Sequence, residues 1–152
     1  MLRETLNQAL KDAMKAKDAR RTATLRLILA ALKDRDIAAR TDGADRSGIP
    51  ETDILAMLQT MVRQRRESIT AYEQGGRLDL VEQEKEEIAI IETYLPQQLS
   101  EAEVEAAAKA AIAEVGAQGI KDMGKAMAVL KGKYVGQMDF SKAAAVLKGL
   151  LT

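Results

Sequence analysis

The chain has 152 residues with 23 basic and 23 acidic side chains, and it contains neither histidine nor cysteine. These absences exclude Cys/His zinc sites, thiol or histidine-dependent catalysis and disulfides. The balanced charge gives no argument for binding nucleic acid or a membrane, and no apolar run approaches the roughly 18 residues of a membrane-spanning helix. We therefore expect a cytoplasmic protein with no metal, no cofactor and no membrane partner.

Apolar residues recur at helical spacing in four successive segments of the first two thirds of the chain. The predicted helices cover residues 2–14, 19–40, 50–74 and 78–95. Polar residues predict a loop at 41–48, and Gly75-Gly76 ends the third helix. Pro96 closes the fourth helix, so we predict a helical N-terminal domain of about four helices, residues 1–96.

After Pro96 the chain becomes rich in alanine, and three more helices are predicted there. They run from Ser100 to near Val115, from Asp122 as cap to Gly136, and from Asp139 or Ser141 as cap to the C-terminus. Ser100 and Glu103 have the spacing of a capping box. No window alternates with a period of two, so the whole chain is predicted to be all-α, with residues 97–152 as a small three-helix C-terminal domain.

Gly124, Ala128 and Gly132 form a stripe almost without side chains along the helix predicted after Asp122. Each glycine inside a helix costs up to about 1 kcal/mol relative to alanine. Close approach of another helix or of a phosphate backbone would offset this cost, and both interpretations stay open. Asp122 argues against the approach of a phosphate backbone, because its carboxylate would compete with a phosphate for the first amides of the helix. The candidate nucleic-acid-binding residues are Lys121, Lys125, Lys131, Lys133, Gly124 and Gly132.

Arg65 lies on the apolar stripe of the third predicted helix, and Glu84 and Glu87 lie on or beside that of the fourth. An antiparallel hairpin places residue 65 opposite about residue 87. We therefore predict a partly buried ion pair of Arg65 with a carboxylate of the fourth helix, which sets register more than it adds stability. An RNA-facing basic cluster at Arg65 is the alternative.

Two further charged groups allow a functional and a structural interpretation. The basic group could contact nucleic acid or an acidic partner, or form a solvated helix end; it comprises Lys15, Lys17, Arg20, Arg21 and Arg26. The acidic group is interpreted as a solvated helix face plus the partner of Arg65; it comprises Glu82, Glu84, Glu86 and Glu87. Neither group has metal-ligand spacing or interleaved aromatic residues for base stacking.

Five segments, in this order, resemble the GatB/YqeY-domain proteins. They are Thr24-Leu-Arg-Leu-Ile28, Ala31-Leu-Lys-Asp-Arg-Asp-Ile37, Arg63-Gln-Arg-Arg-Glu-Ser-Ile69, Ile90-Ile-Glu-Thr-Tyr-Leu-Pro96 and Asp122-Met-Gly-Lys-Ala-Met127. The resemblance covers nearly the whole chain. It implies an all-helical protein whose C-terminal domain is similar to the tail of the B subunit of the glutamine-dependent aminoacyl-tRNA amidotransferase, which engages tRNA.

The resemblance does not extend to the large catalytic domain that the amidotransferase B subunit carries. It therefore implies an amidotransferase-like protein that is not an enzyme on its own. We expect a tRNA-related binding accessory that contacts tRNA through the C-terminal domain. A protein-interaction module without an RNA role is one alternative, and a carbon–nitrogen ligase with glutamine as amido-N-donor, as the family label suggests, is the other.

Overall fold

The computed structural model describes residues 1–41 and 48–152, and it confirms the prediction of an all-α chain. Seven α-helices and one short 3-10 helix account for the regular structure of these residues, and no strand occurs in them. Residues 42–47, most of the predicted polar loop, lie outside the described part. Contacts divide the chain into two compact units, Met1–Leu95 and Pro96–Thr152. The division into an N-terminal domain, residues 1–96, and a C-terminal domain, residues 97–152, stays a prediction.

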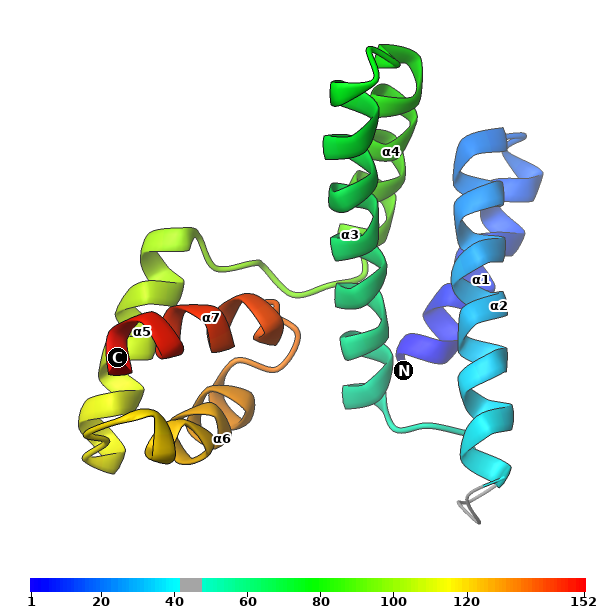
Figure 1. The fold of residues 1–152 in the computed structure, drawn as a ribbon. Helices are drawn as coiled ribbons and strands as arrows, with labels where there is room; N and C mark the ends of the chain where they lie inside the picture. The colour runs from blue at the N-terminus through cyan, green and yellow to red at the C-terminus, as the bar shows by residue number, and fades with distance from the viewer. Residues whose placement is uncertain (42–47) are drawn as a thin grey trace. The chain divides into compact units, whose positions relative to one another are not determined.

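The N-terminal unit consists of four helices (Figure 1). They are α1 (Leu2–Lys15), α2 (Ala19–Thr41), α3 (Glu51–Gln74) and α4 (Leu78–Glu92). The chain turns between α1 and α2 at Lys17, which has a left-handed φ of 56°. It turns again at Gly76, with a φ of 71°, and this turn makes α3 and α4 an antiparallel hairpin. α1 packs against α2, and α2 packs against α4.

The core of the N-terminal unit is aliphatic, as a chain with 3% aromatic residues requires. Its completely buried apolar side chains are Leu6, Leu25, Ile28, Met57, Leu58 and Ile91. Burial of each such side chain contributes about 1.5–3 kcal/mol. Thr24 is also fully buried. Its hydroxyl donates a hydrogen bond of 2.9 Å to the carbonyl of Arg20, so this buried polar group has a partner.

The C-terminal unit consists of three α-helices and the 3-10 helix η1. These are α5 (Glu101–Val115), η1 (Ile120–Asp122), α6 (Met123–Lys133) and α7 (Phe140–Leu151). α5 begins with a capping box, because the Ser100 hydroxyl accepts from the Glu103 amide at 3.1 Å and the Glu103 carboxylate accepts from the Ser100 amide at 3.0 Å. The small core contains Ala107, Ala108, Ala111, Ala126, Ala143, Leu130 and Leu147, and the alanines let the three helices pack closely.

The ends of α6 differ from the prediction. Asp122 is the N-cap residue of α6, as predicted, but its side chain makes no capping hydrogen bond. It ends the 3-10 turn, and its carboxylate accepts from the amide of Gln118 at 3.0 Å. α6 ends at Lys133 rather than at Gly136, which lies in the following turn with a φ of 74°. Asp139, rather than Ser141, caps α7, because its carboxylate accepts from the Ser141 amide at 2.9 Å.

Within residues 1–41 and 48–152, none of the helices combines the length and the apolar character needed to cross a membrane.

Candidate functional site

The glycine stripe of α6 lies open to solvent. Gly124, Ala128 and Gly132 are all exposed, and a Cβ atom added at either glycine would meet nothing within 4 Å. Ala126 and Leu130 form the opposite face of the helix and are completely buried. Packing of the stripe against the neighbouring helices of this unit, one of the two interpretations, is therefore wrong. The cost of the two glycines is not offset inside the unit.

Two of the four candidate lysines, Lys125 and Lys131, lie on α6 beside the stripe, and Lys121 lies in the preceding 3-10 helix η1. Lys121, Lys125 and Lys131 are exposed, and none of them has an ion-pair partner in the described part of the chain. Lys133 differs, because its ammonium group lies 2.9 Å from the Glu114 carboxylate on α5. The hydrogen bond with Glu114 raises the pKa of Lys133. Helix α6 thus offers two unengaged cations, Lys125 and Lys131, beside a smooth backbone surface, and η1 adds Lys121.

The carboxylate of Asp122 does not occupy the first amides of α6. The hydrogen bond from the Gln118 amide is the main cause that lowers the pKa of Asp122, and the charges of Lys121 and Lys125 lower it further. The expected competition between Asp122 and an anion for the first amides of the helix is therefore absent. Asp122 still places one negative charge near two of the lysines.

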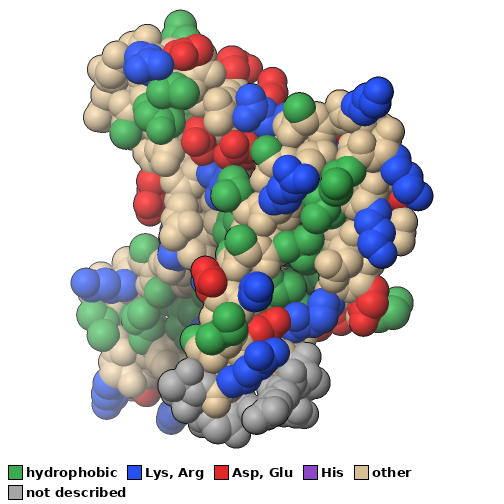
Figure 2. Space-filling view, turned by 90° about the vertical axis from the view of Figure 1, so that its right-hand side faces the viewer, with side chains coloured by type: hydrophobic (Ala, Val, Ile, Leu, Met, Phe, Trp, Pro, Cys, Tyr) green, Lys and Arg blue, Asp and Glu red, His purple; other side chains and the backbone are tan. Residues whose placement is uncertain are grey.

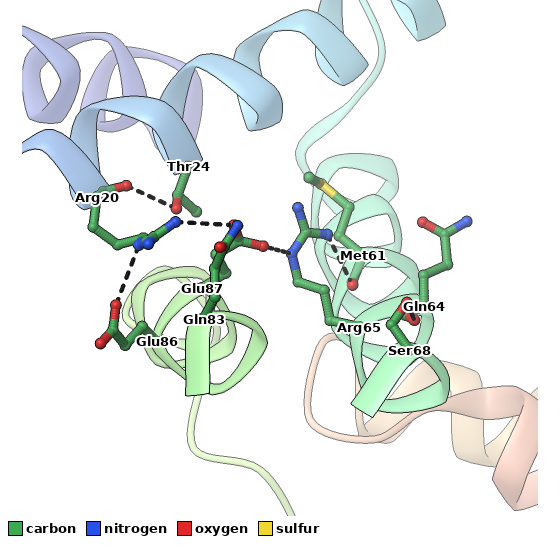
Figure 3. Close-up of polar contacts among 9 residues, drawn as sticks. All are labelled: Arg20, Thr24, Met61, Gln64, Arg65, Ser68, Gln83, Glu86 and Glu87. Carbon is green, nitrogen blue, oxygen red and sulfur yellow. Dashed lines mark hydrogen bonds and ion pairs between the residues drawn. The ribbon is translucent and has the colours of Figure 1, made fainter. Parts of the chain in front are cut away.

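Arg65 and Glu87 meet across the α3–α4 hairpin (Figure 3). The Nε atom of Arg65 lies 3.0 Å from Oε2 of Glu87, and the two side chains are only 13% and 10% exposed. Arg65 also donates a hydrogen bond of 3.2 Å to the carbonyl of Met61. Glu84 has no described hydrogen bond or ion pair with Arg65, and desolvation and the charge of Glu87 raise its pKa.

Arg20 of α2, whose side chain is 39% exposed, extends this buried pair toward the surface. Its Nη1 atom lies 3.7 Å from Oε1 of Glu87, and its Nε atom lies 3.2 Å from Oε2 of Glu86. Glu87 therefore joins α2 and α3 through α4 (Figure 3). Sequence reasoning placed Arg20 in a basic surface group and missed this role, because nothing local in the sequence shows that α2 packs against α4.

The remaining members of the basic group are not gathered around one site. Arg21 donates a hydrogen bond of 3.2 Å to the hydroxyl of Tyr94 and lies 3.8 Å from the Asp18 carboxylate. Lys15, Lys17 and Arg26 are exposed. The group thus contains two arginines engaged in the unit and three solvent-exposed cations.

A second ion-pair cluster, which sequence reasoning missed, ties α1 to α2 and to the start of α3. Arg3 donates to both carboxylate oxygens of Asp36, at 2.6 and 3.2 Å, and to the carbonyl of Ile49 at 3.1 Å. The Ile49 amide donates to Asp36 at 2.9 Å. Gly48, with a φ of 101°, precedes this contact and has no room for a side chain. The positions are far apart in the sequence, so no motif indicates the cluster.

The Arg3–Asp36 pair makes part of the stability dependent on pH. The hydrogen bond from Arg3 is the main cause that lowers the pKa of Asp36, and the Ile49 amide adds to it. A carboxyl group with a lowered folded-state pKa stabilises the fold above its unfolded pKa of about 3.9, and this contribution is lost as the pH falls through the folded-state value. We expect Asp36→Asn to be less stable than the natural chain at pH 7, with a difference that shrinks below about pH 4.

Urea unfolding followed by circular dichroism between pH 7 and pH 2 measures this difference. Asp34→Asn, an exposed change on the same helix, is the matched control and should change stability little at either end of the range. A gap between natural chain and Asp36→Asn that stays constant down to pH 2 would contradict the assigned role of Asp36.

No group of three or more Asp or Glu side chains in residues 1–41 and 48–152 is arranged to hold a metal ion.

The two-unit helical fold agrees with a known class of protein, and so does the order of the five sequence segments given above. The family model described as Yqey-like protein matches residues 3–151. The chain belongs to this YqeY-like family, which is the GatB/YqeY-domain family.

Curated relatives that match the chain share the name "Altered inheritance of mitochondria protein 41, mitochondrial". The protein from Eremothecium gossypii is 37% identical over 90 residues, which are 59% of this chain and 46% of the relative. The protein from Lachancea thermotolerans is 37% identical over 103 residues, 66% of this chain and 52% of the relative. This chain thus spans about half the length of the curated relatives it matches.

The relatives contradict the predicted cytoplasmic location, because their names describe mitochondrial proteins. The prediction rested on the absence of cysteine and of an apolar membrane-spanning run. These properties suit any reducing aqueous compartment, so they do not distinguish the cytoplasm from the inside of an organelle.

Proposed function

We propose that the C-terminal unit is an RNA-binding accessory domain that contacts the phosphate backbone of tRNA through the outer face of α6. The observation that carries this proposal is the exposure of Gly124, Ala128 and Gly132 between Lys125 and Lys131. A phosphate backbone can come close to the helix along such a stripe, and the flanking ammonium groups can each contact a phosphate. The resemblance of this unit to a tRNA-engaging tail supports RNA as the ligand.

The binding is expected to be weak and not specific for base sequence. Lys121, Lys125 and Lys131 supply the unengaged cations, whereas Lys133 is held by Glu114. Two or three phosphate contacts give a shallow dependence of the binding constant on salt. The unit contains no Trp, and its few aromatic side chains, Tyr134 and Phe140, are partly buried in the core rather than displayed for base stacking.

The double variant Lys125→Glu with Lys131→Glu is expected to lose most binding of total tRNA at low salt, because two phosphate contacts become repulsions. Fluorescence anisotropy with labelled tRNA at about 20 to 150 mM salt measures this. Lys109→Glu with Lys148→Glu makes the same change of net charge in the same unit but outside α6, and it should retain most binding. Unchanged binding by the α6 variant at low salt would refute the proposal.

The glycines provide a second arm of the same test, which separates folding from binding. Gly132→Ala adds a methyl group where no atom lies within 4 Å, so it should leave the unit as stable as before or stabilise it by up to about 1 kcal/mol. Gly132→Leu keeps the charge of α6 and fills the stripe, so it should weaken tRNA binding. A stable Gly132→Leu variant that binds tRNA as tightly as the natural chain would show that close approach to the stripe is not needed.

A further inference from the structure

Helix α2 carries apolar side chains on two opposite faces, and the described residues of its unit cover only one of them. Leu25, Ile28 and Leu32 face the core and are buried. On the outer face, Leu27 is 50% exposed and Ile37 is 46% exposed. The exposed small residues Ala23, Ala30 and Ala38 continue this outer face along the helix. A helix that is apolar on both faces is normally covered on both.

A groove between α1 and α2 adjoins this outer face. Its volume is about 350 Å³, and Leu29, Leu32 and Ile37 provide apolar lining. Its charged lining consists of Lys33, Arg40 and the Arg3–Asp36 ion pair. Ile37 belongs to both the groove and the outer face, so the two surfaces are continuous. Figure 2 shows apolar side chains with basic ones beside them on the side of the molecule that faces its viewer.

Along one edge of this outer face the charged side chains are all basic. Arg26, Lys33 and Arg40 lie seven residues apart, so they form a row along one edge of the outer face of α2. All three are exposed, and no described residue forms an ion pair with any of them. Asp34 is the one carboxylate among the exposed residues of the outer face between Ala23 and Ala38. A row of cations spaced by seven residues beside an apolar strip is complementary to a second helix that carries a row of carboxylates beside its own apolar strip.

Two other occupants fit this surface less well. RNA would satisfy the cations, but its backbone would leave Leu27 and Ile37 in water, and the groove has no aromatic residue for base stacking. A second copy bound through the same face around a two-fold axis would bring the row of cations against itself. An antiparallel pairing centred on Ala30 would set Arg26 level with Asp34 of the other copy but leave Lys33 and Arg40 without a carboxylate opposite them, whereas an acidic helix can supply one for each.

We propose that the outer face of α2 and the α1–α2 groove bind an acidic amphipathic helix of a partner protein. The apolar side chains of this helix pack against Leu27 and Ile37, and its carboxylates lie along Arg26, Lys33 and Arg40. This protein-docking surface belongs to the N-terminal unit, so it stands independently of the RNA contact proposed for α6.

The probe that tests the proposal is a pair of synthetic amphipathic peptides of about three heptads, with leucine on one face and either glutamate or lysine along both edges. The full chain should bind the glutamate peptide and not the lysine peptide. Lys33→Glu with Arg40→Glu should weaken binding of the glutamate peptide about tenfold or more and create binding of the lysine peptide. Lys15→Glu with Lys85→Glu makes the same change of net charge at exposed positions off the row and should bind as the natural chain does.

The apolar part of the surface is tested by Leu27→Gln, an exposed change that should preserve thermal stability and weaken binding of the glutamate peptide several-fold. The same variants are titrated with total tRNA and with vesicles that contain phosphatidylglycerol. Equal binding of both peptides, or a loss in the Lys33→Glu, Arg40→Glu variant that affects only tRNA or only vesicles, would overturn the proposal. Because α6 is unchanged in these variants, failure here leaves the RNA proposal intact.

Discussion

Glu87→Leu is expected to lower the free energy of unfolding of the N-terminal unit by about 3 kcal/mol. The change leaves Arg65 with a side chain that is 13% exposed and no carboxylate at 3.0 Å, and it also removes the contact at 3.7 Å from Arg20. An uncompensated buried charge costs more than the intact pair contributes. Urea unfolding followed by circular dichroism measures the loss.

The double variant Arg65→Met with Glu87→Leu distinguishes a buried ion pair from mere loss of packing. Apolar side chains of similar volume remove the unpaired charge, so the double variant should recover most of the stability lost in Glu87→Leu. Glu92→Leu is the matched control: Arg66 and Glu92 also lie 3.0 Å apart, but their side chains are 51% and 35% exposed. We expect it to cost less than about 1 kcal/mol. A double variant as unstable as Glu87→Leu would contradict this account.

Gly48→Ala is expected to destabilise the N-terminal unit by about 2–3 kcal/mol. A non-glycine residue is strained at a φ of 101°, and the added Cβ atom would lie 2.5 Å from Nη2 of Arg3 and 2.8 Å from Oδ1 of Asp36. Relief of this overlap requires Arg3 to move away from Asp36 and from the carbonyl of Ile49. The variant therefore loosens the point where α1, α2 and the start of α3 meet.

Gly76→Ala is the control that isolates the backbone contribution. Gly76 also has a positive φ, 71°, but no atom lies within 4 Å of the position of an added Cβ atom. We expect Gly76→Ala to cost about 1 kcal/mol, the strain of the left-handed conformation alone. Thermal unfolding of both variants measures the difference. Equal losses at the two positions would show that Arg3 and Asp36 move aside without cost.

The ion pair of Arg65 was predicted from the sequence only in part. Helical spacing correctly placed Arg65 and two glutamates on facing stripes of α3 and α4, but it could not choose between Glu84 and Glu87, because both lie near the same edge of the helix. The structure brings Glu87 to 3.0 Å from Arg65. It also adds Arg20, whose contact with α4 depends on how α2 packs, and helix packing is not encoded in the local spacing of residues.

For the glycine stripe of α6, the sequence predicted its position on the helix but not whether it is exposed. The sequence established that Gly124, Ala128 and Gly132 share one side of a helix, since this follows from 3.6 residues per turn. Whether that side is covered depends on where α5 and α7 lie, and the structure places both against the opposite side, around Ala126 and Leu130. Asp122 occupies the predicted N-cap position of α6, but its carboxylate accepts from the amide of Gln118 in the preceding turn instead of capping the helix.

The sequence by itself determined the all-α class, the seven helices, the capping box at Ser100 and the family, because apolar spacing, turn residues and caps act over a few neighbouring residues. Only the tertiary structure decided which surfaces are covered. Glu87 is buried between two arginines, and Arg3 pairs with Asp36. The stripe of α6 and the outer face of α2 are exposed. Burial and ion pairing depend on side chains tens of residues apart, so they appear only when the helices have packed.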